Sequence, residues 1–343
     1  MYGVKGKKFR RQYKKSLSGF KDWKQKSHAE DWIIYPENCS HRLSLDEVAL
    51  SEGELYTVLT SNTARGRKRS LVAMIKGTKS EEVTGRLLKI SRKIRQKVKE
   101  ITLDMAGSMK LIAKQCFPNA MQVVDRFHVQ KLAAEAVQEL RIQYRWEAID
   151  LENEIIKQSR DKKVKPDIHI FENGDTRKQL LARSRYLLYK SREKWTENQS
   201  KRVKILFREY PDLEKIYHLS DSLRKIYNQN ITKSVAMLKL AHWFKDVEES
   251  GFKSFSTLKN TIINHYNDIL NYFQARSTNA AAESFNAKIK NFRLQLRGVK
   301  DRAFFLFRLA KLLAMIRRYP KTKYCTNVVP RIKAQKNSLK KES

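Results

Sequence analysis

Four acidic residues follow predicted strands or lie on a predicted helix in positions that could form an active site: Asp46, Asp104, Asp125 and Glu283. Asp104 follows the alternating run 98–103 and precedes several small residues, which is typical of a strand that ends on a carboxylate. Asp125 follows a second short apolar run in the same way. Because reactive groups of open α/β sheets collect where strands end, both aspartates are candidates for one site. Either one taken alone is explained about as well as the cap of the helix that follows it.

Asp46 ends an earlier alternating run, and residues 55–60 make its hairpin partner. Residues 70–75 form a third strand, and a helix over 81–99 leads into the strand that ends at Asp104. The resulting order, β-β-β-α-β-α-β, is the ribonuclease-H-like order, which predicts a mixed five-stranded sheet with flanking helices. In that topology the first and fourth strands are neighbours, so Asp46 and Asp104 are expected to lie together.

A late helix carries Glu283. Asn279, Glu283, Asn286 and Lys290 are spaced i, i+4, i+7 and i+11, which places them on one helical face. The apolar positions on the other face are Ala282, Phe285, Ile289 and Phe292. A helix of this kind, laid on a sheet, aims its acid at the strand ends. The same spacing also fits an ordinary surface helix with Glu283 in water.

Asp46, Asp104 and Glu283 together predict a metal centre. Gathering like charges costs several kcal/mol unless a cation or a shared proton relieves the repulsion. Carboxylate oxygens favour Mg²⁺ or Mn²⁺, and two such ions about 4 Å apart assist displacement at a phosphodiester. If Asp104 is only a helix cap, Asp125 takes its place as the second acid.

The chain is strongly basic along its whole length. It has 343 residues with 72 Lys and Arg against 36 Asp and Glu, a formal net charge of +36. Such a chain repels itself unless a polyanion neutralises it, so the predicted partner is a long phosphate backbone. Binding to a membrane surface explains the charge equally well, but it predicts a concentrated amphipathic basic helix, which the sequence lacks.

The cysteines and the apolar runs bear on location. Cys39, Cys116 and Cys325 are far apart and form no CxxC pair, so neither a disulfide nor a zinc ribbon is expected. Free thiols fit a reducing cytoplasm. The first thirty residues lack the apolar segment of a signal peptide, and the longest apolar run, 303–316, is short and contains basic residues. A cytoplasmic protein without a membrane span is predicted.

Changes in composition and hydrophobic periodicity along the sequence suggest five segments. They are a basic N-terminal arm (1–38), the first part of the α/β core (39–145), an all-α insertion (146–274), the last helices of the core (275–318) and a basic tail (319–343). Aromatic residues are interleaved with the basic ones in the arm: Phe9, Tyr13, Phe20 and Trp23. This composition favours an arm whose aromatics stack on or anchor to DNA, or else a solvated tail.

Three stretches carry a resemblance to a known family. They are LSLDEVALSEGELYTVLT, EITLDMAGSM followed by VVDRFHVQKL, and TNAAAESFNAKIKNFR followed by RGVKDRAFFLFRLAKL. The chain resembles, over about 40–316, the DDE transposases of bacterial insertion sequences, in the ISL-three group and its ISAon-like branch. The resemblance implies that Asp46, Asp104 and Glu283 are the DDE triad on a ribonuclease-H-like core interrupted by an all-α insertion. Asp125 and His128 match a D-x-x-H element and are expected to be accessory, with Asn279 and Asn286 beside them.

By this resemblance the protein is expected to cleave double-stranded DNA at transposon ends and to transfer the strands to target DNA, using two Mg²⁺ or Mn²⁺ ions. Arg126, Lys288, Lys290 and Arg293 are the expected phosphate contacts. The expected assembly on DNA is a homodimer or larger, in the nucleoid of a bacterial cytoplasm. Many members carry a substantial N-terminal region with a zinc ribbon and a helix-turn-helix, whereas this chain begins almost directly at the catalytic part, so either a separate end-recognition protein or a truncated chain is expected. The alternatives are a nuclease or resolvase of the same fold, and a non-catalytic DNA-binding protein derived from a transposase.

Overall fold

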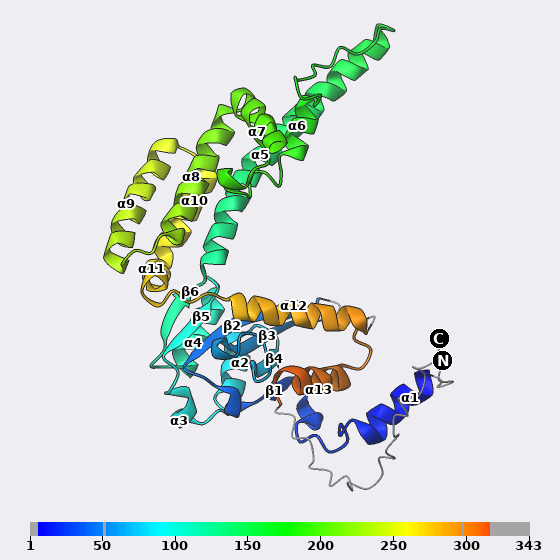
Figure 1. Cartoon of the computed structure of the whole chain (residues 1–343), viewed down its shortest axis with the longest axis vertical. Coiled ribbons are helices and arrows are strands. Elements are labelled where there is room, and N and C mark those ends of the chain that lie inside the picture. The colour runs from blue at the N-terminus through cyan, green and yellow to red at the C-terminus, as the bar shows by residue number, and fades with distance from the viewer. Residues whose placement is uncertain (1–5, 51–52, 297, 316–343) are drawn as a thin grey trace, which may run out of the picture.

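The computed structural model describes residues 6–50, 53–296 and 298–315. The predicted basic tail at 319–343, with Cys325, lies outside these residues. A mixed sheet with helices on both faces forms one part of the molecule, and a tall helical lobe rises from one edge of that sheet (Figure 1). None of the described helices combines the length and the apolar composition needed to cross a lipid bilayer.

Six strands form the sheet in the order β1-β4-β3-β2-β5-β6. They are β1 (Trp32–Ile34), β2 (Arg42–Ala49), β3 (Leu55–Ser61), β4 (Leu71–Lys76), β5 (Glu100–Leu103) and β6 (Met121–Val124). β1 to β4 pair antiparallel, whereas β2, β5 and β6 are parallel. The α/β class and the predicted strand order are confirmed. The sheet has one strand more than predicted, because β1 adds to the outer edge of β4 from within the stretch assigned to the basic arm.

β2 does not end at Asp46, contrary to the expectation from the sequence. It continues to Ala49, because the hairpin with β3 stays paired as far as Ala49 opposite Leu55. The parallel pairing with β5 stops earlier, at Ser44 opposite Thr102. Asp46 therefore lies inside a strand, at the point where the neighbouring parallel strand has ended.

Helices α2, α3 and α4 cover one face of the sheet. Their bounds are α2 (Ser80–Leu87), α3 (Arg92–Arg95) and α4 (Gly107–Cys116). Leu45, Leu103 and Ile112 belong to the apolar core between this layer and the sheet. The helix predicted over 81–99 is broken into α2 and α3 by a turn that places Ile90 in this core.

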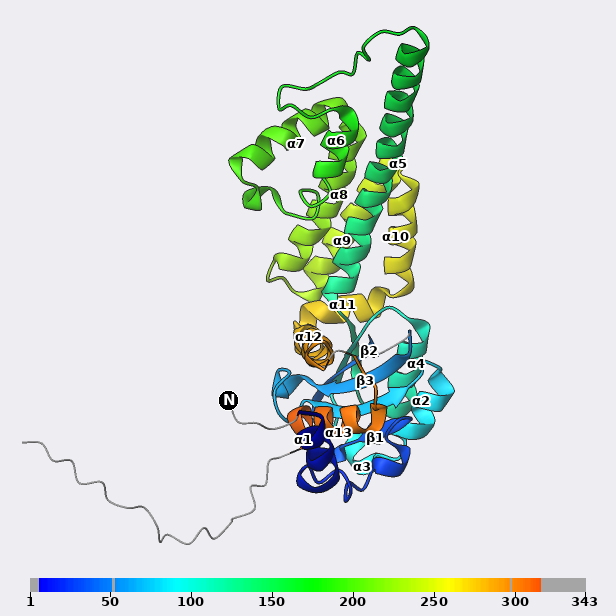
Figure 2. The same cartoon turned by 90° about the vertical axis from the view of Figure 1, so that its right-hand side faces the viewer.

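The opposite face carries helices α12 (Ala280–Gln295) and α13 (Arg302–Leu313), as Figure 1 shows. The N-terminal helix α1 (Gly6–Gln12) extends away from these two helices (Figure 1), and Figure 2 shows the helical lobe standing on the side of α12 away from α13. Phe20 and Trp23 are buried in this core, with ring centroids 5.2 Å from Phe304 and 5.2 Å from Phe307, respectively. The expectation that these two aromatics contact DNA is wrong, because they pack against α13. Phe9 remains 52% exposed.

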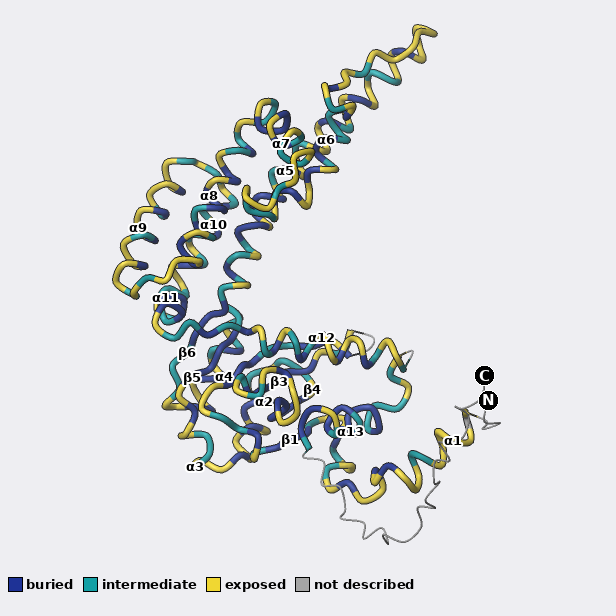
Figure 3. Tube along the Cα trace, viewed as in Figure 1, coloured by how far each residue is buried: buried dark blue, intermediate teal, exposed yellow. Residues whose placement is uncertain are grey.

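The helical lobe is built on α5, a 36-residue helix that begins directly after β6. The lobe contains α5 (Arg126–Asp161), α6 (Arg177–Arg183), α7 (Glu197–Glu209), α8 (Pro211–Asn228), α9 (Lys233–Ser250), α10 (Lys253–Asn264) and α11 (Tyr266–Ala275). The far end of α5 is largely exposed (Figure 3). α11 lies against the sheet edge, where Asn271 Nδ2 donates to the Gln122 carbonyl at 2.9 Å and Lys110 pairs with Asp268 at 2.6 Å.

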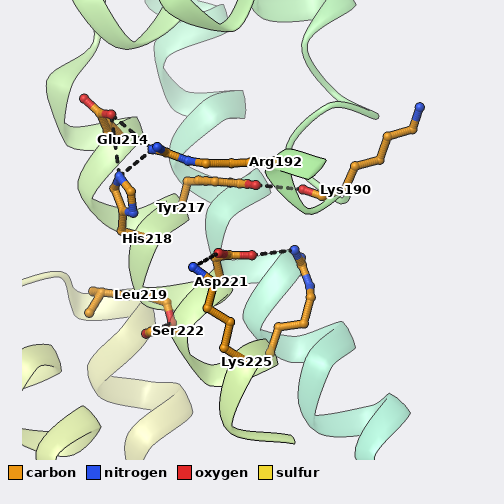
Figure 4. A network of polar contacts seen from close by, with 10 residues as sticks. Lys190, Arg192, Glu214, Tyr217, His218, Leu219, Asp221, Ser222 and Lys225 are labelled. Carbon is orange, nitrogen blue, oxygen red and sulfur yellow. Dashed lines mark hydrogen bonds and ion pairs between the residues drawn. The ribbon is translucent and has the colours of Figure 1, made fainter. Parts of the chain in front are cut away.

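Polar contacts fasten the irregular segment before α7 to α8 (Figure 4). Tyr217 donates its hydroxyl to the Lys190 carbonyl at 2.8 Å, and Arg192 bonds Glu214 at 3.3 Å. A second fastening lies just before α6, where the fully buried Asp175 pairs with Arg183 and Arg202. Because this carboxylate is buried, its two arginines are what allow it to remain charged.

Candidate active site

The sheet register aligns Asp46 with Asp104. Ser44 of β2 pairs with Thr102 of β5 in parallel, and continuing that register by two residues places the two aspartates opposite each other. In a strand, residues two apart share a face, so Asp46 lies on the same face of the sheet as Ser44 and Val48. Val48 packs in the core beneath α12 and α13, so that face is the one that these two helices cover.

Asp125 extends the same row by one strand. Leu103 of β5 pairs with Val124 of β6, and the Asp125 backbone N–H donates to the Leu103 carbonyl at 3.1 Å. The next pair in this register is Asp104 with Asp125. Three aspartates from three adjacent parallel strands thus form one row at the ends of β5 and β6.

Asp46 is half-buried and hydrogen-bonded on both oxygens. Oδ1 accepts from the Glu47 backbone N–H at 2.8 Å, and Oδ2 accepts from Asn286 Nδ2 of α12 at 2.8 Å. Burial raises the pKa of Asp46 and the nearby charge of Asp104 raises it further, while Glu47 N–H, His128 and Asn286 act in the opposite direction. A cation at this point would favour the charged form and relieve the repulsion between the two acids.

Asp104 has one oxygen engaged in the turn that enters α4. Its Oδ1 accepts from the Ala106 backbone N–H at 2.8 Å. This bond closes a turn before the helix and is not the helix cap considered from the sequence, because Ala106 is the N-cap residue of α4 and no side chain caps that helix. Within the described part of the chain no group bonds to Oδ2, so this oxygen of Asp104 is available to a ligand.

Asp125 is buried, with 2% of its surface exposed, at the start of α5. Burial raises its pKa, and the backbone N–H groups of Asn279 and Phe127 together with the charges of His128 and Arg126 counteract that rise. Asn279 immediately precedes α12. The carboxylate of Asp125 therefore connects the end of β6 with the beginning of the helix that carries Glu283.

Glu283 lies in the first turn of α12 and is exposed, yet it lies within the field of the aspartates. Its pKa is raised by partial burial and then by Asp125 and Asp46, while His128 lowers it. Glu283 thus lies close enough to Asp125 and Asp46 for their charges to act on it. Of the four acids considered from the sequence, all are brought to this one edge of the sheet.

Two amide oxygens beside these acids are buried without a hydrogen-bond partner: Asn279 Oδ1 and Asn286 Oδ1. Both lie on the polar stripe of α12 that carries Glu283. Oxygen donors of carboxylate and amide type suit a hard divalent cation such as Mg²⁺ or Mn²⁺. Among the residues that the structure describes, no three His, Cys, Asp or Glu side chains already stand as a metal-binding group. The types of oxygen donor present suit a metal ion, although in the described residues they are not yet gathered into a complete coordination shell.

The basic residues predicted to contact phosphate have distinct surroundings. On α12, Lys288 Nζ donates to the Gly66 carbonyl, and Arg293 donates to the Leu50 carbonyl at 2.6 Å. These two side chains fasten the turns of the sheet to α12, whereas Lys290 is exposed on the same helix.

Arg126 lies on the lobe side of the site. Its guanidinium is 3.4 Å from Asn228 Oδ1 and 3.4 Å from the Tyr272 hydroxyl. Arg126 thus connects the start of α5 with α8 and α11. His128, in the first turn of α5, is half-buried and acts electrostatically on Asp46, Asp125 and Glu283.

Sequence reasoning missed Glu47 and Gly66. The pKa of Glu47 is raised by burial and by the charges of Asp104 and Asp46, so a further acid borders the site. Strand alternation assigns Glu47 to the face opposite Asp46, so the sequence pattern gave no reason to include Glu47 in the site. Gly66 lies in the β3–β4 connection, and its position within a basic loop was the one sequence signal that could have drawn attention to it.

Known proteins resemble this chain over the region just described. A sequence model of the ISL3-type DDE transposase family, described as "Transposase", matches residues 43–309. A curated protein, the transposase for insertion sequence element IS1001 of Bordetella parapertussis, is 22% identical over 268 residues. That alignment covers 78% of this chain and 59% of the relative, so the chain spans less than two thirds of the relative's length. The family match covers more than half of the chain and includes Asp46, Asp104, Asp125 and Glu283, and the chain belongs to the ISL3 family of DDE transposases.

Proposed function

We propose that this protein is an insertion-sequence transposase that cuts DNA at the ends of its element and joins the exposed 3′-hydroxyls to target DNA. One observation carries the proposal: the sheet register aligns Asp46 with Asp104 beneath α12, whose first turn carries Glu283. Membership of the DDE transposase family supports the same activity.

Asp46, Asp104 and Glu283 are the residues that would hold Mg²⁺ or Mn²⁺. Bound there, two such ions supply activation of the attacking oxygen and stabilisation of the leaving oxygen. In cleavage, a water oxygen bonds to the scissile phosphorus as the bond to the 3′ oxygen breaks and that oxygen leaves as a hydroxyl. In strand transfer, this hydroxyl attacks a target phosphodiester, so one P–O bond forms as another breaks.

The other residues of the site orient these acids. Asn286 fixes one oxygen of Asp46 through its hydrogen bond, and Asp125 holds the start of α12 through the Asn279 backbone. His128 counters the negative charge of the cluster. Lys290 on α12 is an exposed cation available to DNA phosphates. Because both ends of an element must be held together, the proposed active species is a dimer or larger assembly on double-stranded DNA.

The decisive experiment is a cleavage assay on duplexes that carry the element's own ends, with Mg²⁺ or Mn²⁺. Asp46→Asn, Asp104→Asn and Glu283→Gln are expected to abolish cleavage while DNA binding persists, because each removes one anionic ligand. Asp125→Asn is expected to reduce cleavage only in part. Asp150→Asn on the exposed surface of α5 is the isosteric control and should leave cleavage unchanged.

Two results would count against the proposal. If the wild type binds the ends but never cuts them, the protein is a DNA-binding member of the family without catalysis. If Asp125→Asn abolishes cleavage and Asp104→Asn does not, the second acid is Asp125 and the assignment of the triad changes.

A further inference from the structure

The connection between β3 and β4 is a basic loop that reaches the active-site helix. It carries Arg65, Arg67, Lys68 and Arg69, all of them exposed. Gly66 among them is buried, with φ +66°. Arg65 and Arg69 also have positive φ angles, 48° and 66°. A tight, left-handed path thus brings the loop backbone, rather than its side chains, against α12.

The contact between Gly66 and α12 leaves no room for a side chain. A Cβ at Gly66 would lie 2.9 Å from Ser284 Oγ and 3.2 Å from the Ala281 carbonyl oxygen. Both residues flank Glu283 on α12 within two positions. Lys288, one turn further along, donates to the Gly66 carbonyl and closes the contact.

Arg69 holds the other end of the loop. Its guanidinium donates to the Glu37 carbonyl at 2.8 Å and to Asn38 Oδ1 at 3.3 Å. Asn38 is buried and donates to the carbonyls of Leu71 and Ala314. The loop is therefore pinned at both ends, to α12 and to the base of β4.

Three cations of this pinned loop remain available among the described residues, those of Arg65, Arg67 and Lys68, and the last two border one pocket. Within the described chain, no acid or carbonyl pairs with the side chains of Arg67 and Lys68. Together with Lys288 they line an open pocket of about 440 Å³ between the loop, α12 and α13. Much of the lining is apolar, from Phe292 of α12 and from Leu309, Leu312 and Leu313 of α13, and Asn291 and Gln295 offer amides. Three cations and an apolar surface in one lining, with no acid among them, match a ligand that combines anionic and apolar parts, as the phosphates and sugars of a nucleic-acid strand do.

We propose that this pocket binds the sugar-phosphate backbone of the DNA strand that enters the active site, with Arg67 and Lys68 as its phosphate contacts. The inference rests on the proposed function for the identity of the polyanion. Lys288 lies five residues after Glu283, about 7.5 Å along the helix axis. For a strand that runs along α12, with about 3.4 Å of rise per nucleotide, the bound phosphate is expected about two nucleotides from the cleaved bond.

The chain offers a matched control for this pocket. Arg67→Gln/Lys68→Gln removes an adjacent Arg–Lys pair, and Arg92→Gln/Lys93→Gln removes the same pair of residue types from α3. α3 belongs to the helices on the opposite face of the sheet, and Arg92 and Lys93 are exposed there (Figure 1). Both variants lower the net charge equally, so a difference between them reports position rather than total charge.

The measurement is the affinity for an end duplex as a function of salt. The pocket variant is expected to bind roughly ten-fold more weakly at low salt, the size of a lost charge-assisted contact. Its slope of log affinity against log salt should be shallower by about 1 to 2, because each phosphate contact releases about one counterion. The α3 variant is expected to keep the slope of the wild type.

A second measurement locates the contact. Methylphosphonate is placed at one backbone position at a time, which removes the charge of that phosphate. The wild type should lose affinity at positions one to three nucleotides from the cleaved bond, and the pocket variant should lose no further affinity there.

Equal slopes for the two variants, or equal methylphosphonate sensitivity of the pocket variant and the wild type, would overturn the pocket assignment. If the wild type then still cuts DNA with Mg²⁺, the transposase proposal stands without the pocket. If the wild type binds and shows the local phosphate contact but never cuts, the pocket stands and the catalytic proposal fails.

Discussion

At the scale of single residues, the site depends on hydrogen bonds that orient charged oxygens. Asp46 has a defined direction because Asn286 and the Glu47 backbone hold one oxygen each. Asp104 is held through one oxygen by the Ala106 backbone. Acids that are oriented before a metal binds lose less conformational freedom when they bind it. The hydrogen-bond partners of the acids therefore influence metal affinity, in addition to the acids themselves.

Asn286→Ala tests this role. The substitution removes the amide that orients Asp46 while leaving all acids in place. We expect cleavage to need 10- to 100-fold more Mg²⁺, roughly the effect of losing a hydrogen-bond partner of a metal ligand. A Mg²⁺ titration of the cleavage rate measures the shift.

The matched control is Asn260→Ala, which truncates an exposed asparagine on α10. It should leave the Mg²⁺ dependence unchanged. An Asn286→Ala protein with the Mg²⁺ requirement of the wild type would show that Asp46 needs no such partner.

At the scale of elements, α12 is positioned by the turns beneath it. Gly66 contacts it beside Glu283, Arg293 donates to the Leu50 carbonyl, and Asp125 holds its beginning. These contacts come from the β3–β4 connection, the end of β2 and the end of β6. The position of Glu283 is thus set by three separate segments of the sheet.

Gly66→Ala is the sharpest test of that arrangement. The left-handed backbone alone costs an alanine about 1 kcal/mol of unfolding free energy. The added methyl must also displace Ser284 or the α12 backbone, because it would lie 2.9 Å from Ser284 Oγ. We expect a marked loss of cleavage together with the modest loss of stability, measured by urea unfolding and by the cleavage assay.

Gly174→Ala separates strain from displacement. Gly174 has φ +78° and no atom within 4 Å of the position of a Cβ. It should lose a similar amount of stability while keeping full cleavage. Equal cleavage by the two alanine variants would mean that the loop does not position α12.

At the scale of the whole molecule, the helical lobe is stabilised by ion pairs of its own. Asp175 is fully buried with Arg202 at 2.8 Å and Arg183 on its other oxygen. We expect Asp175→Asn to lose about 3 kcal/mol of unfolding free energy, since it leaves two arginines facing a neutral group. Glu197→Gln, which opens the exposed pair with Lys201, should cost less than about 1 kcal/mol.

The same carboxylate gives a pH dependence. Burial acts to raise the pKa of Asp175, but Arg202 and Arg183 outweigh it and hold the pKa below its usual 3.8. A depressed pKa contributes stability that is fully present above 3.8 and is lost as the pH falls through the folded value. Urea unfolding below pH 4 should therefore show a steeper loss of stability in the wild type than in Asp175→Asn. Parallel curves would contradict this assignment.

The sequence predicted those features that local patterns encode. The strand order, the helix of α12 and the apolar faces follow from hydrophobic periodicity, and the motifs indicated the family. The row formed by Asp46, Asp104 and Asp125 could not be foreseen in this form, because register depends on pairing between distant strands. Phe20 and Trp23 were misassigned for a related reason, since their packing partners on α13 lie far along the chain and local composition indicated a solvated or DNA-bound arm.

The long helix α5 has a mechanical consequence. It begins at Arg126, immediately after the row of acids, and runs for 36 residues, a length of about 54 Å. As a rigid lever pivoting at the site, it would turn a rotation of about 5° at its base into a displacement of about 5 Å at its tip. Such a lever would amplify small rotations of α5 near the acids at the far end of the lobe. A pair of spectroscopic labels that measures the distance from the tip of α5 to the sheet would then detect rotations too small to resolve at the site.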